Sequence, residues 1–329
     1  MSEIIDAVNR FRAQLLSADR ATRLEMARRW LAVENALAPQ VDALVMEILA
    51  SPAPLTNWQI ARLRRYRALM EQIDEQLRRY GATSATTIAE RQMQLVSLAQ
   101  DHAVGMAEAQ AGPAIRNQFD RLPVRATENM IGVIGNGTPL NAVLADASRI
   151  GPDALGGELV NGIALGLNPR EIARRALRRG LAQSYVRMTT IARTETLRVY
   201  RETTLESYRR SNVVVGYKRI ASKSIRTCLG CLMADGMIYR LESEFEEHVN
   251  GRCVAIPILR DMSEPTWTTG QQWFEQQPPT VQREMMGNGL YNIWQSGRVD
   301  LSEMWRRIED PTWGNSIVPA RVRDFEGRI

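Results

Sequence analysis

The cysteines and histidines of this chain are few, and most of them lie close together. All three cysteines, Cys228, Cys231 and Cys253, fall within 26 residues, and His248, one of only two histidines, lies among them. A Cys-x2-Cys pair brings two thiolates to one ion, and a second pair of ligands from a later segment completes a tetrahedron. The spacing therefore predicts a metal site with four protein ligands.

Zinc is the ion that three thiolates and one imidazole favour. Four protein ligands leave no position for a reactive water, so the predicted site is structural. Gly230 and Gly251 give the backbone room at its corners. As an alternative, the cysteines are small buried hydrophobes, or Cys228 and Cys231 form a transient disulfide. That alternative does not explain the positions of His248 and Cys253, and an odd number of cysteines argues against a disulfide framework.

The composition is that of a globular protein, with 44% hydrophobic and 24% charged residues in 329. No apolar run approaches the roughly 20 residues that cross a bilayer. The N-terminus lacks the basic-then-apolar order of a secretory signal, so we expect assembly in a cytosol.

Hydrophobic periodicity predicts a mainly α fold with an extended helical N-terminal part, a small zinc-stapled α+β domain and a helical C-terminal tail. A β-rich unit of this size buries little surface, so zinc is expected to contribute to its stability. Four segments are expected: a helical bundle over 1–111, a helical connector over 112–212, the β-rich zinc domain over 213–260 and the helical tail over 261–329.

Caps and glycines suggest where several helices begin and end. Thr56 or Asn57 is expected to cap one helix, which Gly81 would end. Asn168, followed by Pro169, is expected to cap another that ends at Gly180.

The next helix is expected over about 183–210, and it places Glu195 inside an apolar stripe. A buried carboxylate needs a partner. An arginine from a neighbouring segment is the simple answer, and Arg193 or Arg187 are the local options. A catalytic acid is the alternative. His102, on an earlier helix, is expected to be a packed or solvated helical residue.

The β-rich unit begins with a strand in VVVGYKRIA, followed by a turn at Asp235-Gly236 and a further strand, and ends with a strand in CVAIPIL. Beyond it, four helical stretches are expected, the last of them LSEMWRRIED over 301–310. The final residues, 311–329, show little periodicity and are expected to wrap a partner or another domain.

Arginine supplies nearly all of the positive charge. Only Lys218 and Lys223 are lysines, so 40 of the 42 basic residues are arginine and the net charge is +5. One basic flank follows Asn168 and is either a solvated helix face or a contact for phosphate or an acidic partner; it comprises Arg174, Arg175, Arg178 and Arg179.

The sequence around the cysteines resembles the phage Mu F-like head morphogenesis proteins, also called minor head or minor capsid proteins. In that family an "ARTE" helix leads into a strand, a "D-x-R-T-C-x-x-C" segment with "DG" follows, and the domain closes on "HPNCRC" and a proline. The matching residues are Ile191, Ala192, Arg193, Thr194, Glu195, Arg226, Thr227, Cys228, Cys231, Asp235, Gly236, His248, Arg252, Cys253 and Pro257.

The resemblance covers roughly residues 160–305, with two departures. Ser224 stands where the family often has aspartate, and Gly251 replaces the first cysteine of "CRC". Four ligands survive, because Cys253 remains.

The resemblance implies a structural head protein of a tailed bacteriophage that acts in prohead assembly at or near the portal. It implies contact with the portal protein and with the major capsid or scaffold protein, and a place in the virion head after assembly in the host cytoplasm. We expect no enzymatic activity and no membrane contact, and a role in genome packaging or delivery stays open. The alternatives are a virion protein that binds phage DNA and a metal-dependent nuclease or hydrolase.

Overall fold

The computed structural model of this protein describes residues 2–53 and 55–327. The chain forms two compact units, each built from segments that are distant in sequence. The helical unit comprises Ala18–Arg91 and Thr138–Arg193, and the mixed unit comprises Met1–Ser17, Gln92–Gly137 and Thr194–Ile329. The mainly α fold expected from the sequence is confirmed. The division into four successive segments stays a prediction.

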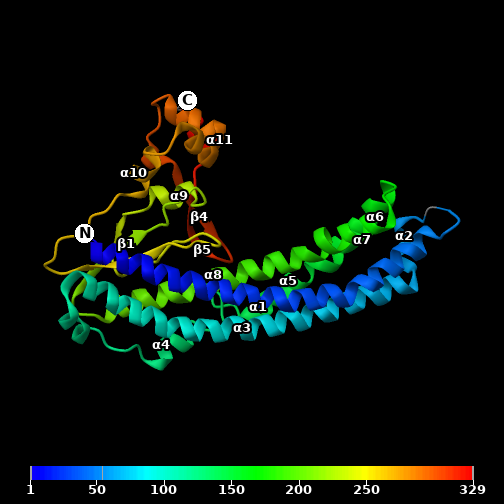
Figure 1. Cartoon of the computed structure of the whole chain (residues 1–329), viewed down its shortest axis with the longest axis horizontal. Helices are drawn as coiled ribbons and strands as arrows, with labels where there is room; N and C mark the ends of the chain where they lie inside the picture. The colour runs from blue at the N-terminus through cyan, green and yellow to red at the C-terminus, as the bar shows by residue number, and fades with distance from the viewer. Residues whose placement is uncertain (1, 54, 328–329) are drawn as a thin grey trace. The chain divides into compact units, whose positions relative to one another are not determined.

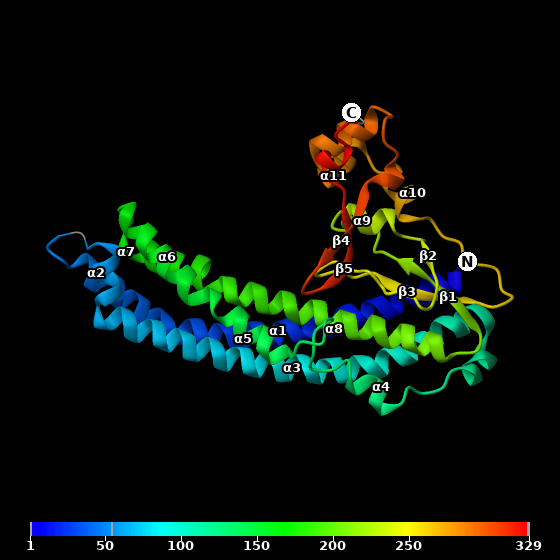
Figure 2. The ribbon, with the colours of Figure 1, turned by 180° about the vertical axis from the view of Figure 1, so that it is seen from behind.

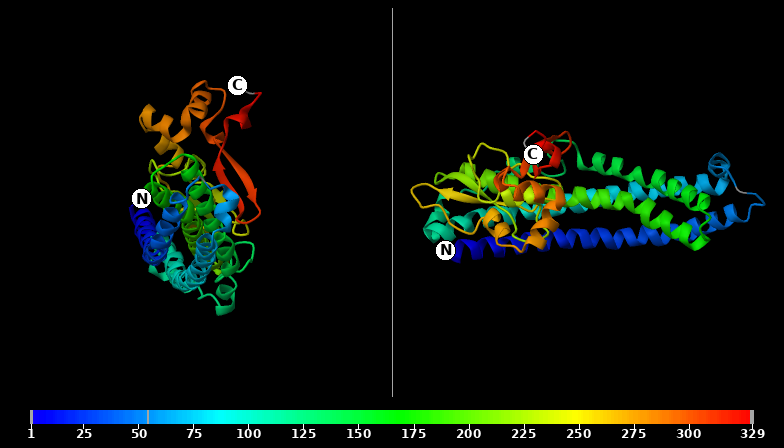
Figure 3. Two further views of the ribbon diagram at one scale, coloured as in Figure 1. Left: turned by 90° about the vertical axis from the view of Figure 1, so that its right-hand side faces the viewer. Right: turned by 90° about the horizontal axis from the view of Figure 1, so that it is seen from above.

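The helical unit contains parts of three long helices and five shorter elements (Figures 1 and 3). The long helices are α1 (Ser2–Leu49), α3 (Arg64–Ala111) and α8 (Ala182–Arg210). The shorter elements are α2 (Asn57–Arg62), α5 (Leu140–Ser148), α6 (Ile150–Ala164), α7 (Pro169–Arg175) and the π-helical turn η2 (Ala176–Leu181).

Apolar residues at helical spacing hold the helical unit together. Leu37, Val41 and Leu44 of α1 are fully buried, as are Ile73 and Leu77 of α3. Their spacing of three, four or seven residues places them on one face of each helix, as burial against a neighbouring helix requires.

Two glycines do not end helices as the sequence suggested. Helix α3 passes through Gly81 without a break. The chain also stays helical at Gly180, because η2 leads directly into α8. A Cβ at position 180 would lie 2.5 Å from the Cα of Leu155 in α6. Gly180 therefore permits a close crossing of two helices and is not a C-cap. The predicted caps at Thr56 and Asn168 are confirmed.

The mixed unit adds short helices, two sheets and the remainder of the long helices (Figure 2). Its further elements are η1 (Pro113–Gln118), α4 (Val124–Glu128), β1 (Val214–Ile220), α9 (Leu229–Met233), β2 (Ile238–Tyr239), β3 (Val254–Leu259), α10 (Gly270–Glu275), α11 (Pro279–Gln295), η3 (Leu301–Glu303), β4 (Trp305–Asp310), β5 (Gly314–Pro319) and η4 (Val322–Phe325).

The three strands predicted within 213–260 are confirmed and form one antiparallel sheet in the order β2-β1-β3. One face of the sheet packs on helices: Tyr217 and Leu259 share a buried cluster with Ala103 of α3 and Leu205 and Tyr208 of α8. The small sheet therefore has an apolar core that its own residues could not supply. Zinc is not the only feature that could stabilise it.

His102 is a packed core residue in α3. Its Nδ1 lies 2.9 Å from the hydroxyl of Tyr200 and its Nε2 lies 2.7 Å from Oε1 of Gln14. The ring also stacks on Phe11. Burial, and then the charge of Arg10, lower the pKa of His102 to about 4, so the ring is neutral at pH 7.

The C-terminal region differs from its expected form. Residues 301–310, expected as a helix, form the short turn η3 and the strand β4, which pairs with β5 in a hairpin. Half-buried and exposed residues alternate from Arg306 to Asp310 of β4, as in a strand with one side partly covered. The tail beyond residue 311 supplies β5, and β5 packs against α9 of the same chain. Across the described residues, the structure has no helix of the length and apolarity that a membrane span requires.

The close crossing at Gly180 can be tested with two alanine variants. Gly180→Ala should destabilise the protein by about 1–3 kcal/mol, because the new methyl group meets the backbone of α6. Gly157→Ala, in exposed helix with open space around it, should stabilise by about 0.5–1 kcal/mol. Urea denaturation measures both. Equal effects of the two substitutions would show that Gly180 is not at a crossing.

Candidate metal centre

The first two predicted ligands lie at the start of α9. Cys228 is the N-cap of this helix, and its Sγ accepts a hydrogen bond from the backbone N–H of Cys231 at 3.2 Å. The turn before it is closed by Ser224 and Thr227, whose hydroxyls lie 3.1 Å apart. Ser224 thus closes the turn at a position where the family that this sequence resembles often has aspartate.

His248 brings its imidazole to both thiols. Its Nε2 lies 3.1 Å from the Sγ of Cys228 and 3.1 Å from the Sγ of Cys231. Its Nδ1 lies 2.8 Å from the carbonyl oxygen of Val249. A carbonyl only accepts, so Nδ1 carries the proton and Nε2 presents its lone pair to the thiols. This is the tautomer that a metal ligand requires.

Cys253 completes the set of predicted ligands on the other side of Cys231. The potential ligand atoms of Cys228, Cys231 and His248 lie within 4.8 Å of one another. Those of Cys231, Glu247 and Cys253 form a second such group. Because Cys231 belongs to both groups, all four predicted ligands lie in one cluster, to which the structure adds Glu247.

The thiols influence one another strongly. A hydrogen bond from Cys231 lowers the pKa of Cys228. The hydrogen bond to Cys228, together with burial, raises the pKa of Cys231 well above that of a free cysteine. The hydrogen bond to Cys231, together with burial, does the same for the pKa of Cys253. Crowded, buried thiols resist carrying several negative charges without a compensating cation. The donor set therefore fits a divalent ion, which would replace the thiol protons.

Glu247 organises the segment that carries His248 and Cys253. Its Oε1 accepts from the N–H of His248 at 3.1 Å and from the guanidinium of Arg219 at 3.0 Å. Its Oε2 accepts from the N–H of Cys253 at 3.1 Å. Burial alone would raise the pKa of Glu247, but Arg219 and then Arg201 hold it at about 2. The buried carboxylate is therefore charged.

Two buried arginines connect this segment to the rest of the mixed unit. Arg219 of β1 also donates to the carbonyl oxygen of Glu246 at 2.6 Å, and its side chain is 1% exposed. Arg201 of α8 donates to the carbonyl oxygen of Gly251 at 3.3 Å. The ring of Phe245 lies beneath both guanidinium groups. The ligand segment is thus attached to a strand and to a helix.

The glycines at the corners have specific neighbours. A Cβ on Gly251 would overlap the carboxylate of Glu247. A Cβ on Gly230 would lie 2.6 Å from the carbonyl carbon of Val318, because β5 passes directly over α9. The resembling family often has cysteine at position 251, whereas here the neighbouring glutamate fills that space.

A cavity of about 290 Å³ borders the cluster on the side of the β4–β5 hairpin. Cys228 and His248 line it together with Ile308, Val318 and Pro319. Asp310, the acidic residue in its lining, accepts hydrogen bonds from the N–H groups of residues 312 and 313 at the hairpin turn. The exposed side of the cluster is therefore mainly apolar.

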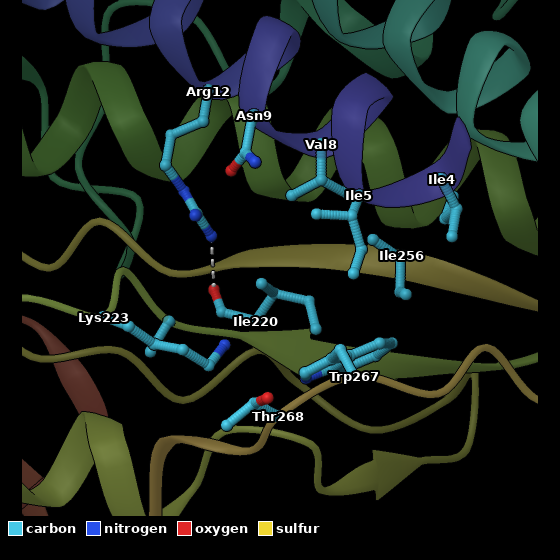
Figure 4. A pocket seen from close by; sticks show the side chains of 11 residues that line it. Ile4, Ile5, Val8, Asn9, Arg12, Ile220, Lys223, Ile256, Trp267 and Thr268 are labelled. Carbon is cyan, nitrogen blue, oxygen red and sulfur yellow. Dashed lines mark hydrogen bonds between the residues drawn. The ribbon is translucent and has the colours of Figure 1, made fainter. Parts of the chain in front are cut away.

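A separate pocket of about 310 Å³ lies in the mixed unit between the first turns of α1 and the sheet (Figure 4). Arg12 of α1 points across it and donates to the carbonyl oxygen of Ile220 at 3.2 Å. Lys223 forms an ion pair with Asp235. The Arg12 contact attaches the N-terminal turns to β1, and none of the predicted metal ligands lines the pocket.

The three motif residues of α8 have separate contacts. Arg193 forms an ion pair with Asp19 at 3.0 Å within the helical unit, and so it is not the partner of Glu195. Thr194 accepts from the N–H of Asn250, which lies within the segment that carries His248 and Cys253. Glu195 is fully buried, as its place in the stripe predicted, but its partner is Arg198 at 2.5 Å and not Arg193 or Arg187.

The basic flank of the helical unit is partly neutralised. Arg174 and Arg175 both form ion pairs with Glu171. Arg178 and Arg179 are exposed, and among residues 2–53 and 55–327 neither forms an ion pair.

Sequence reasoning missed Glu247 and Arg219. The only signal for Glu247 was its position beside His248, and nothing local distinguishes it from the neighbouring Glu246. Arg219 lies in a strand whose opposite faces are both largely buried, so alternation did not mark it as unusual.

Comparison with known proteins gives one finding. Residues 153–256, about a third of the chain, match the family described as Phage Mu protein F like protein. This stretch runs from α6 to β3 and includes the predicted ligands. No curated protein and no solved structure matches the chain.

The metal prediction can be checked by elemental analysis of the purified protein. The four-ligand site should hold about one zinc ion per chain, and His248→Ala or Cys253→Ser should remove it. His102→Gln, which changes the other histidine, should leave the metal content unchanged. Zinc retained at full occupancy by both ligand variants would contradict the assignment.

The role of Glu247 predicts a large difference between two adjacent residues. Glu247→Gln should cost about 3–5 kcal/mol, because it leaves Arg219 buried without its counter-charge. Glu246→Gln should cost less than about 1 kcal/mol, because its partner Arg307 is 62% exposed. Urea denaturation with and without a chelator separates this effect from metal loss. Similar values for the two variants would exclude the role given to Glu247.

Proposed function

From the Phage Mu F-like region of residues 153–256, we propose that this chain is a structural head protein of a tailed bacteriophage. It acts in prohead assembly at or near the portal and resides in the head of the virion. Its partners are the portal protein and the major capsid or scaffold protein. The family match is the observation that carries this proposal.

Within that role, the Cys/His cluster holds a structural zinc ion. Cys228, Cys231, His248 and Cys253 supply the four ligands, and zinc would cross-link α9 to the segment before β3. The chemistry of the neighbouring carboxylate supports a role without catalysis. The carboxylate of Glu247 already accepts hydrogen bonds from Arg219 and from two backbone N–H groups. A zinc hydrolase usually needs a carboxylate that is free to act as a base.

Contact with phage DNA is the second candidate, and the exposed Arg178 and Arg179 favour it. It is the weaker of the two, because the other half of the same flank is neutralised by Glu171. Arginine side chains can bind carboxylates of a protein partner equally well.

The proposed function can be tested by deleting the gene from the phage that encodes this chain. Heads made without it should be aberrant or lack DNA, and electron microscopy with quantification of packaged DNA would show this. Supplying the wild-type protein from a plasmid should restore normal heads, and His248→Ala should restore fewer.

Two results would contradict the proposal. One is normal heads with normal DNA content after deletion, and the other is absence of the protein from both proheads and virions. His102→Gln, supplied in the same way, is the matched control for the substitution of a histidine outside the cluster.

A further inference from the structure

A polar cavity of about 580 Å³ lies along α8 in the mixed unit. One side is formed by a face of α8 between residues 194 and 209, and another by the segment 244–247. Residues 309–311 and 313–315, at the turn of the β4–β5 hairpin, line it as well. This cavity is distinct from the one that borders Cys228 and His248.

The cavity is strongly acidic in a chain that is basic overall. Seven carboxylates and three arginines line it, a formal charge of −4, whereas the whole chain carries +5. Arg219 and Arg307, outside the lining, compensate two of these carboxylates. An excess of negative charge remains.

The arginines in the lining are already occupied. Arg198 pairs with Glu195 and Glu202, both at 2.5 Å, and donates to the carbonyl oxygens of Met130 and Val133. Arg201 donates to a backbone carbonyl of the ligand segment. Arg209 donates to the carbonyl oxygen of Leu241 and pairs with Glu206. None of the three arginines can neutralise a further carboxylate without losing these contacts.

Glu195 carries an unsatisfied oxygen in this lining. The residue is fully buried, and Oε2 is the oxygen that contacts Arg198. Its Oε1 has no hydrogen-bond partner within the described part of the chain. An unpaired buried carboxylate oxygen costs free energy that a donor would recover. This residue belongs to the α8 motif, and the proposed head role assigns it no task.

Two further carboxylates face the same cavity from other elements. Glu244 belongs to the loop before His248, and Glu309 belongs to β4. Both side chains are exposed to solvent, and the described residues provide no ion-pair partner for either. The cavity therefore offers acceptors from a helix, a loop and a strand.

We propose that this cavity receives a guanidinium group from a partner polypeptide, with Oε1 of Glu195 as its buried acceptor. A guanidinium presents five N–H donors in a plane, so it can bond carboxylates that approach from different directions. A divalent cation fits less well. Among the described residues that line the cavity, Glu247 alone belongs to a group of converging metal-ligand atoms, and that group lies at the cysteines. The proposal does not depend on the head role.

The experiment measures binding of fluorescent peptides to the purified, folded chain by anisotropy at low salt. One peptide alternates glycine, serine and arginine, and its matched control has lysine in place of arginine. The wild type should bind the arginine peptide more tightly than the lysine peptide. Glu195→Gln should weaken this binding about ten-fold or more, because it removes a charge-assisted hydrogen bond.

Two other variants keep the test decisive if Glu195→Gln fails to fold. Glu244→Gln and Glu309→Gln leave the Arg198 ion pairs intact and should each weaken binding about two- to five-fold. Glu284→Gln, at an exposed position outside the cavity, should leave it unchanged.

Three results would overturn the proposal. The first is equal affinity for the arginine and lysine peptides, and the second is unchanged affinity in the cavity variants. The third is selective displacement of the peptide by magnesium compared with sodium at the same ionic strength, which would indicate a cation site. Failure of these measurements would leave the deletion test of the head role unaffected.

Discussion

The buried ion pair between Glu247 and Arg219 is the interaction on which the arrangement around the cysteines depends. The carboxylate accepts hydrogen bonds from the backbone N–H groups of both His248 and Cys253. It therefore positions the two later ligands without the help of an ion. The guanidinium attaches that carboxylate to β1, in the middle of the sheet. A buried charge of this kind is costly unless it is fully paired, and here each oxygen of the carboxylate accepts at least one hydrogen bond.

Packing on helices gives the small sheet a foundation that a zinc ion alone would not. Tyr217 and Leu259 bury their side chains against α3 and α8, while Leu229 and Leu232 of α9 join a cluster with the C-terminal helices. The cysteines lie where these layers meet. A metal ion at this point would cross-link segments that are already packed, so its loss should weaken the domain locally as well as lower its stability.

The three motif residues of α8, Arg193, Thr194 and Glu195, have separate roles and do not form one site. Arg193 pairs within the helical unit, Thr194 supports the ligand segment, and Glu195 lines an acidic cavity. Consecutive residues on a helix point about 100° apart, so they reach different surroundings. If a guanidinium binds at Glu195, the recognition site would lie beside the segment that carries His248 and Cys253.

The residues themselves determined the features that depend on spacing and local conformation. The Cys-x2-Cys turn with His248 and Cys253, the strands around Tyr217 and Ile256, and the caps at Thr56 and Asn168 all follow from short-range geometry. Tertiary structure alone decided the rest: Glu247 as the organiser of the ligands, Arg198 as the partner of Glu195, Gly180 as a helix crossing and residues 305–310 as a strand. Each of these depends on a neighbour that is brought close by packing. Local propensity is worth only a few tenths of a kcal/mol per residue, to about 1 for glycine, and burial or ion pairing at such a contact outweighs it.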